Sequence, residues 1–277
     1  MSEAEPVTID SSRRTAHEIF DKAAENAEDE LSRSSRALAV SGLTGGVTMG
    51  LTGLAVASVR AILGQGPTAE LVAFFFYPIG FIAVIIGRAQ LFTENTLYPV
   101  VLVLTDHRHI RNTLRLWGIV FVANVAGAFL FALLASHTSS LEPKIAEELV
   151  KLGIDSVSMT TSRMFWSGVF GGWLIALVAW MVSASHWTIG QIAVVWLLTF
   201  LVGIARFAHC IATSGEIITA ALAGAVPISS YLHWLLFATL GNIVGGVSLV
   251  SLMNWGQVHA GEEQKPVNGR RKARLAA

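Results

Sequence analysis

The sequence is poor in cysteine and in charged side chains. Its 277 residues include one cysteine, Cys210, so an intramolecular disulfide and a cysteine-rich metal centre are both excluded. Charged residues make up 14% of the chain, hydrophobic residues make up 53%, and the mean hydropathy is +0.59. A soluble domain needs more polar side chains than this to cover its surface. The composition therefore predicts a membrane protein.

Motifs for chemistry are also missing from the sequence. It contains no phosphate-binding loop, no histidine spacing typical of metal ligands and no nucleophile motif. A membrane enzyme would need paired carboxylates or a nucleophile with its base within reach of one surface, and the sequence offers neither. The net charge is zero and the basic residues flank apolar segments, so nothing points to nucleic acid. We expect no enzymatic activity, no cofactor and no bound metal.

Long apolar runs provide the helices of this membrane protein. A helix needs about 20 apolar residues to cross the hydrocarbon region. The runs do not show the alternation that the strands of a β-barrel require. Six segments qualify, of which the second and the fifth are interrupted: 37–59, 71–104, 116–136, 164–185, 187–219 and 231–255. We therefore expect an all-α membrane protein with six transmembrane helices.

Basic residues gather at one set of span ends. Lysine and arginine are enriched on the cytoplasmic side of membrane proteins. In a six-helix arrangement the relevant residues all fall on the same side: Arg33, Arg36, Arg108, Arg111, Arg115, Lys265, Arg270, Arg271, Lys272 and Arg274. Both chain termini are therefore predicted to be cytoplasmic, in a multi-pass protein of the bacterial cytoplasmic (inner) membrane.

Three regions follow from these spans. Residues 1–36 form a cytoplasmic N-terminal segment, in which Thr15 and Glu18 fit a capping box that begins an amphipathic helix. We expect this helix to lie against the bundle or the membrane surface. Residues 37–256 form the transmembrane domain. Residues 257–277 form a basic cytoplasmic tail, which the positive-inside rule explains better than a lipid-binding role.

The two halves of the transmembrane domain repeat one pattern. Ser41–Gly46 (SGLTGG) matches Ser167–Gly172 (SGVFGG), and Ala123–Ala128 (ANVAGA) matches Gly241–Gly246 (GNIVGG). Each half holds three spans, and an odd number of spans in each half forces the halves into opposite orientations. This is the 3+3 inverted repeat of many transport proteins.

The interruptions of the second and fifth spans also match. The interval that separates Asn124 from Asn242 separates Arg88 in the first break from Arg206 in the second. Backbone groups freed by a broken helix must be buried in protein or line a cavity, and paired breaks point to a substrate site near the midplane. We expect both broken helices to meet at the centre of a pathway. The two asparagines are expected to hold the broken segments by hydrogen bonds between helices.

The sequence around the breaks resembles the formate/nitrite transporter family. The shared motifs are LFTENT (Leu91–Thr96) in the second span, FAHCIA (Phe207–Ala212) in the fifth and GNIVGG in the sixth. The resemblance implies an aquaporin-like fold, a homopentamer with one pore in each protomer, and passage of small monovalent weak-acid anions such as formate, nitrite, lactate or hydrosulfide. Three residues depart from the usual pattern and indicate a divergent branch: Ala208, Thr213 and Gly172.

The same resemblance implies which residues line the pathway. Thr93 in the first break and His209 in the second form the central site, and Leu91 and Phe92 lie in the hydrophobic constrictions. Counting along the family pattern adds three lining residues: Tyr77, Phe81 and Val202. His209 would be an ionisable group inside a span, and such groups usually mark a pathway. We expect it to link transport to protons.

Two arginines near the breaks have a structural and an electrostatic interpretation. Arg88 and Arg206 either tie down the breaks by pairing with Glu94 and Glu216, or gather anions at an entrance. We favour pairing because a buried arginine needs a partner.

The leading interpretation is a channel or transporter for small monovalent weak-acid anions, proton-linked through His209. Two alternatives remain open on the sequence alone. One is a pore for neutral solutes such as water, ammonia or undissociated acid. The other is a non-conducting membrane scaffold or sensor built on the same architecture. A flux that responds to pH would favour the anion interpretation.

Overall fold

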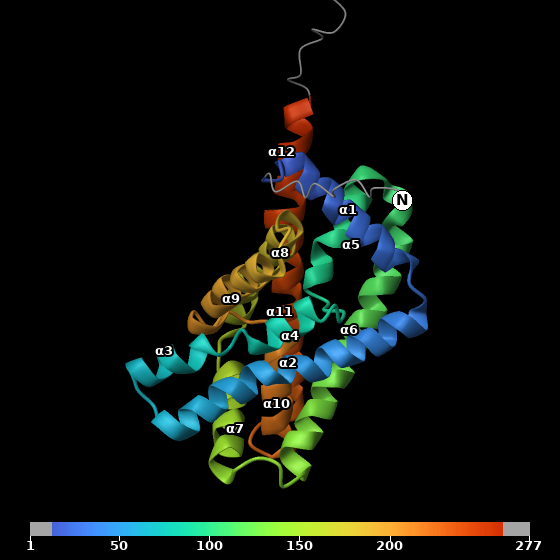
Figure 1. Cartoon of the computed structure of the whole chain (residues 1–277). Helices are drawn as coiled ribbons and strands as arrows, with labels where there is room; N and C mark the ends of the chain where they lie inside the picture. The colour runs from blue at the N-terminus through green and yellow to red at the C-terminus, as the bar shows by residue number, and fades with distance from the viewer. Residues whose placement is uncertain (1–12, 263–277) are drawn as a thin grey trace, which may run out of the picture.

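The structure, a computed structural model, describes residues 13–262, and the regular secondary structure in this part of the chain is helical throughout (Figure 1). An N-terminal helix, α1 (Ala16–Ser32), precedes the bundle. The first half comprises α2 (Ser35–Leu63), α3 (Pro67–Phe75), α4 (Ile79–Ile86), a 3₁₀ turn (Glu94–Thr96), α5 (Tyr98–Thr105), a second 3₁₀ turn (His107–His109) and α6 (Ile110–His137). After the connecting helix α7 (Pro143–Val157), the second half comprises α8 (Thr161–Ala184), α9 (Thr188–Ile204), α10 (Ala212–Leu222), α11 (Ile228–Gly246), a π-helix (Val247–Leu252) and α12 (Met253–Glu262).

The predicted plan of six spans with two broken helices is confirmed. Within residues 13–262, five helices are long and apolar enough to cross a membrane, and the shorter apolar helix α9 begins the fifth span. α4 ends at Ile86 and α5 begins at Tyr98, whereas α9 ends at Ile204 and α10 begins at Ala212. Figure 1 shows α1 and α12 at one end of the bundle and α7 at the other. These are called the α1 end and the α7 end below.

The N-terminal helix α1 is amphipathic, as its sequence pattern predicts. Thr15 and Glu18 form the capping box: the Glu18 N–H donates to the Thr15 hydroxyl oxygen at 3.3 Å, and the Thr15 N–H donates to the Glu18 carboxylate at 2.6 Å. The helix packs against α5, α8 and α12. Its buried residues are Phe20, Ala23, Ala27 and Leu31. The apolar face of α1 therefore lies against the bundle.

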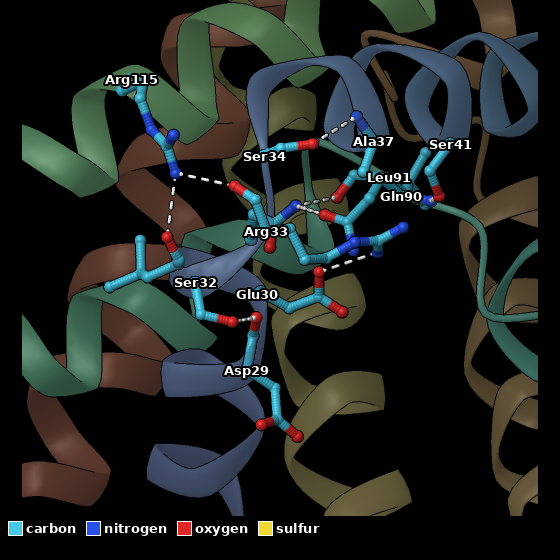
Figure 2. Close-up of polar contacts among 12 residues, drawn as sticks. Asp29, Glu30, Ser32, Arg33, Ser34, Ala37, Ser41, Gln90, Leu91 and Arg115 are labelled. Carbon is cyan, nitrogen blue, oxygen red and sulfur yellow. Dashed lines mark hydrogen bonds and ion pairs between the residues drawn. The ribbon is translucent and has the colours of Figure 1, made fainter.

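The junction between α1 and α2 is held by an arginine from α6. Arg115 donates from Nη2 to the carbonyl oxygens of Leu31 at 2.9 Å and Arg33 at 3.1 Å, as Figure 2 shows. Arg33 in turn pairs with Glu30 at 3.0 Å. Arg115 thereby supplies donors to carbonyl groups that the end of α1 leaves without helical partners.

Repeated glycines bring the helices of each half close together. α2 packs on α6, and α8 packs on α11. A Cβ atom on Gly46 would lie 2.1 Å from the Asn124 carbonyl oxygen, and a Cβ atom on Gly172 would lie 2.1 Å from the Asn242 carbonyl oxygen. A side chain does not fit at these distances. The matched motifs therefore carry glycine for close helix packing, a common use of small residues in membrane proteins.

A turn inside the second span was not predicted. Residues 76–78 separate α3 from α4, and Pro78 precedes the first residue of α4. Proline has no N–H to donate to the preceding turn, which favours a helix boundary here. At the C-terminus, α12 extends to Glu262, and the remainder of the predicted basic tail, 263–277, lies outside the described residues.

The π-helix in the sixth span was not predicted either. Ser251 in this segment donates to the Thr96 carbonyl oxygen at 2.8 Å. A Cβ atom on Gly246, the residue before the π-helix, would lie 2.0 Å from the Thr96 hydroxyl oxygen. The sixth span is therefore distorted where it meets the first break, which is consistent with the frequent occurrence of π-bulges at functional sites.

Gly46→Ala tests the close packing of α2 on α6. The added methyl group would meet the Asn124 backbone, so the helices must separate, and overpacking of this kind costs roughly 1–3 kcal/mol. We expect a lower midpoint of thermal unfolding for the purified protein in detergent. Gly118→Ala on α6 is the matched control, because a Cβ atom there has open space around it. Equal midpoints for the two variants would contradict the packing role of Gly46.

Candidate functional site

Both breaks begin with the same backbone turn. Arg88 and Arg206 have φ angles of 59° and 53°, in the left-handed region that glycine usually occupies after a helix end. In each break the arginine N–H donates three residues back and the next N–H donates five residues back, as from Ala89 to Val84 at 3.0 Å. This is a Schellman motif with arginine in the glycine position, and the left-handed conformation costs a non-glycine residue about 1–2 kcal/mol.

A buried asparagine satisfies the freed backbone of the first break. Asn124 on α6 accepts from the Phe92 N–H at 2.8 Å and donates to the carbonyl oxygens of Gly42 at 2.7 Å and Gln90 at 2.9 Å. The Ser41 hydroxyl oxygen accepts from the Gln90 N–H at 3.1 Å, a contact that Figure 2 includes. These four bonds attach the first break to α2 and α6.

The second break is held by the matching residues. Asn242 on α11 accepts from the Cys210 N–H at 2.9 Å and donates to the carbonyl oxygens of Gly168 at 2.8 Å and Ala208 at 2.9 Å. The Ser167 hydroxyl oxygen accepts from the Ala208 N–H at 3.4 Å. The contacts of both asparagines are those expected of residues that hold broken segments by hydrogen bonds between helices.

The two breaks meet at a hydrogen bond between Thr93 and His209. The Thr93 hydroxyl oxygen lies 2.8 Å from His209 Nε2, and both side chains are fully buried. The other ring nitrogen, Nδ1, accepts from the backbone N–H groups of Ala212 at 3.0 Å and Ile211 at 3.4 Å. A neutral ring with Nδ1 as acceptor carries its hydrogen on Nε2 and donates it to Thr93. The Thr93 hydroxyl keeps its own hydrogen for another acceptor.

These contacts also restrict the chemistry of His209. A hydrogen added to Nδ1 would face two N–H donors at the start of α10, where a helix carries positive partial charge. The arrangement therefore favours His209 as a neutral hydrogen-bond donor over His209 as the carrier of a transported proton.

Aromatic rings extend from the central pair toward the α7 end. The Phe81 ring meets the His209 ring edge-on with centroids 5.0 Å apart, and the Tyr77 ring centroid lies 5.6 Å from that of Phe81. Phe81 and Val202 are fully buried, and Tyr77 is nearly so. Phe81 therefore contacts His209 and Tyr77 contacts Phe81, whereas Val202 shares a cavity wall with Tyr77.

The remaining two predicted lining residues belong to the first break. Leu91 is fully buried. The Phe92 ring lies against α6, where its centroid is 5.0 Å from that of Phe121 and 5.7 Å from that of Trp117. Trp117 also donates from Nε1 to the Asn95 carbonyl oxygen at 2.9 Å. The described contacts of Phe92 are therefore with the α6 side of the break.

A cavity of about 280 Å³ opens at the α7 end of the molecule, and we name it the α7-end cavity. Tyr77 and Val202 form part of its wall, together with Ala208 and Thr213 from the second break and the start of α10. Five of its lining residues have ionisable side chains: Tyr77, Asp155, Arg163, Arg206 and Glu216. Polar and apolar groups therefore share the wall of this cavity, which includes Ala208, the residue before His209.

A smaller cavity of about 80 Å³ lies at the α1 end. α1 contributes Asp29 and Glu30 to its lining, and the first break contributes Arg88 and Glu94. One break thus lines each cavity, and the fully buried Thr93–His209 pair joins the two breaks.

The predicted pairing of Arg206 with Glu216 is wrong. Arg206 Nη2 lies 2.6 Å from Glu70 Oε2, and Arg206 Nη1 lies 3.3 Å from Asp155 Oδ2. Glu70 also pairs with the buried Arg60 at 2.7 Å. These partners come from α2, α3 and α7, and nothing local in the sequence connects them with the break. In the sequence, Glu70 and Asp155 are recognisable only as charged residues near the span ends on the α7 side.

The predicted pairing of Arg88 with Glu94 is not found either. Both residues line the small cavity at the α1 end, but the part of the chain that the structure describes contains no ion pair between them. Glu94 begins a 3₁₀ turn, and Arg88 lies at the left-handed position before it. The backbone of the break, held by asparagine, thus leaves the two side chains apart.

The chain is similar in sequence to a family of membrane transporters and to several known proteins. The model of the family described as formate/nitrite transporter matches residues 17–256. The chain is 31% identical over 276 residues to the inner membrane protein YfdC of Escherichia coli (strain K12), covering 98% of this chain and 88% of that protein. It is 29% identical to a probable formate transporter of Methanothermobacter thermautotrophicus, covering 69% and 77%.

Two solved structures share the fold. An "FNT family ion channel" superposes with a TM-score of 0.78 at 20% identity, covering 87% of this chain and 99% of that one. A "pentameric formate channel with formate bound" superposes with a TM-score of 0.68 at 19% identity, covering 81% and 98%. The aquaporin-like arrangement of six spans that the sequence implied is thereby confirmed.

Asn242→Ala tests how the second break is held. The variant leaves the Cys210 N–H and two carbonyl groups without their partner in a buried site, and each such group costs roughly 1–3 kcal/mol. We expect a clearly lower midpoint of thermal unfolding in detergent, and a similar drop for Asn124→Ala because its contacts match. Asn112→Ala, at an exposed position of α6, is the control. A midpoint that does not change in either buried variant would contradict this role.

Proposed function

The chain belongs to the formate/nitrite transporter family, and from this premise we propose that it is a membrane channel for small monovalent weak-acid anions. Formate and nitrite are the first candidates because the family and a relative carry these names. The observation that carries the proposal is the buried 2.8 Å hydrogen bond between Thr93 and His209, where the two broken helices meet.

Hydrogen-bond donors at this point serve an anion or its acid. Moving an isolated carboxylate into a low-dielectric medium costs tens of kcal/mol, and the central pair has apolar neighbours such as Phe81 and Leu91. The Thr93 hydroxyl accepts from His209, so its own hydrogen is available to donate to an oxygen of the solute. Thr93 and His209 are the site at which a solute oxygen replaces its water.

Transport is proton-linked in this proposal. Protonation of the anion removes most of the free-energy cost of moving its charge through the apolar constrictions. The solute therefore crosses as the undissociated acid or as the anion together with a proton. His209 is a neutral donor in the observed contacts, so the proton comes from outside the central pair. Tyr77, Phe81, Val202, Leu91 and Phe92 form the apolar walls.

The arginines take different roles. Arg206 is bound to two carboxylates and stabilises the second break. Arg88 makes no ion pair with Glu94 within the described residues, and it contributes positive charge to a cavity at the α1 end that Asp29, Glu30 and Glu94 also line. Enzymatic activity is not part of this proposal.

The assembly and the orientation are proposed from the resemblance. A similar solved structure is a pentameric channel, and we assign this chain to a homopentamer with one pore in each protomer. The basic residues near the α1 end support a cytoplasmic position for that end, and for both termini, in the bacterial inner membrane. They include Arg33, Arg36, Arg111 and Arg115.

Uptake into proteoliposomes tests the function. Formate and nitrite should enter vesicles with the wild-type protein faster than empty vesicles, and His209→Phe should lower the rate at least about tenfold, the equivalent of one lost hydrogen bond to a charged group. His137→Phe, at an exposed end of α6, is the control. Entry of water or ammonia without any anion would assign a neutral-solute pore, and no passage at all would assign a scaffold.

Thr93→Val separates the hydroxyl group from the shape of its side chain. Valine keeps the volume of threonine but offers no hydrogen bond, so formate uptake should fall about tenfold. Thr93→Ser keeps the hydroxyl and should retain most of the wild-type rate. Equal rates for the valine and serine variants would show that the hydroxyl does not contact the solute.

A further inference from the structure

A buried carboxyl group in the α7-end cavity has no role in the function proposed so far. Glu216 lies on α10, is 6% exposed, and lines the cavity together with Tyr77, Val202 and Thr213. It thus lies about one turn into α10, in the wall of the cavity from which, in the proposed function, a solute would approach the central pair from the α7 end.

The backbone of α2 makes room for this carboxyl group. A Cβ atom on Gly53 would lie 2.6 Å from Glu216 Cγ and 2.7 Å from Glu216 Oε1. Any other residue at position 53 would displace the carboxyl group from the cavity wall. The absence of a side chain at position 53 therefore leaves the space that the Glu216 carboxyl group occupies.

Glu216 has no hydrogen-bond or ion-pair partner among the described residues. Trp234, also part of the cavity lining, is fully buried, and its Nε1–H has no acceptor in the described part of the chain. A buried polar group without a partner is costly. An acceptor and a donor on one cavity wall thus remain for the contents of the cavity.

The other ionisable groups near Glu216 are engaged elsewhere or lie at the rim. Arg60 and Arg206 are both bound to Glu70, and Arg206 also to Asp155. Tyr231 donates to Ser214 at 3.0 Å. The helices packed against α10 are α2, α6, α7 and α11. The ionisable side chains on these helices and on the elements beside them include Arg60 (α2), Glu70 (α3), Tyr77 (α3–α4 turn), His137 (α6), Glu148, Lys151 and Asp155 (α7), Arg163 (α8), Arg206 (second break) and Tyr231 (α11).

We propose that Glu216 is the proton donor that neutralises the anion before it enters the apolar constriction. The inference rests on the proposed function and supplies the proton that His209 does not. The Glu216 O–H bond breaks, its hydrogen passes as a proton to an oxygen of the weak-acid anion, and the electron pair stays on the carboxylate. The products are the undissociated acid and a Glu216 carboxylate. A hydronium ion from the solution at the α7 end then gives its proton to the carboxylate and leaves as water, which completes the cycle.

The place of Glu216 suits this step. The anion is neutralised in a cavity that still contains polar groups, among them Arg206 with its carboxylate partner Asp155. The apolar walls begin at this cavity. The acid then meets Phe81 and the Thr93–His209 pair without a net charge. Ala208, the residue before the central histidine, has no proton to supply. Of the two carboxyl groups that line the cavity, Asp155 and Glu216, Glu216 is the closer to His209 in the sequence.

The pH profile of formate uptake tests the proposal. Without a donor, the variant Glu216→Gln depends on acid protonated in bulk water, so its rate should fall about tenfold for each pH unit above the acid's pKa. The wild type should fall less steeply, and Glu216→Asp should lie between the two. Glu147→Gln, an exposed carboxyl on α7, should keep the wild-type profile. A uniform change in rate at every pH would assign Glu216 an electrostatic effect only and overturn the proposal.

Labelling of the wild-type protein provides a measurement that needs no variant to fold. Dicyclohexylcarbodiimide reacts with protonated carboxyl groups in apolar surroundings, and peptide mass mapping locates the product. Modification of Glu216 that increases as the pH falls, and that formate slows, is expected. No modification of Glu216 at any pH would overturn the proposal.

The two proposals fail in different ways. If the wild-type protein carries no anion faster than empty vesicles, the proposed function fails and this inference fails with it. If the wild type carries formate while Glu216→Gln keeps the wild-type pH profile, the inference alone fails.

Discussion

Backbone polar groups inside a membrane must find partners within the protein, and this requirement shapes both broken helices. A break exposes N–H and carbonyl groups that a continuous helix would pair. In each half one asparagine provides one acceptor and two donors to the break and to a neighbouring helix, with distances of 2.7–2.9 Å. The glycines beside these asparagines allow the helices to approach closely enough for the bonds to form. Packing and hydrogen bonding are therefore parts of one arrangement.

The sequence predicted the features that repeat within it. Charge-free runs predicted the spans, and the matched motifs predicted the inverted halves, the two breaks and the residues that hold them. The Thr93–His209 pair came from the resemblance to a family, because no periodicity brings together two residues on different spans. The partners of Arg206 were not predictable, since Glu70 and Asp155 approach it only after three elements have packed. Arginine at a left-handed position was also missed, because glycine is the usual signal there.

The halves share a framework but differ in their chemistry. Equivalent turns, asparagines and serines support both breaks, yet one break supplies the Thr93 hydroxyl and the other supplies the His209 imidazole. Two identical breaks would offer an anion the same donor twice. The two different breaks offer it two kinds of donor from two directions. The framework holds both segments in place, and the side chains that differ between the halves give the centre a hydroxyl and an imidazole and the α7-end cavity a carboxyl group.

The π-helix of the sixth span sets the rotational phase of α12. Each residue of an α-helix turns the chain by about 100°, and a π-turn holds one residue more than an α-turn. The faces of α12 are therefore offset from those of a continuous α11. His259 on α12 meets the Phe20 ring of α1 with centroids 5.7 Å apart. Loss or gain of one residue within Val247–Leu252 would turn His259 away from α1, so a change of length deep in the bundle governs how the N-terminal helix is seated.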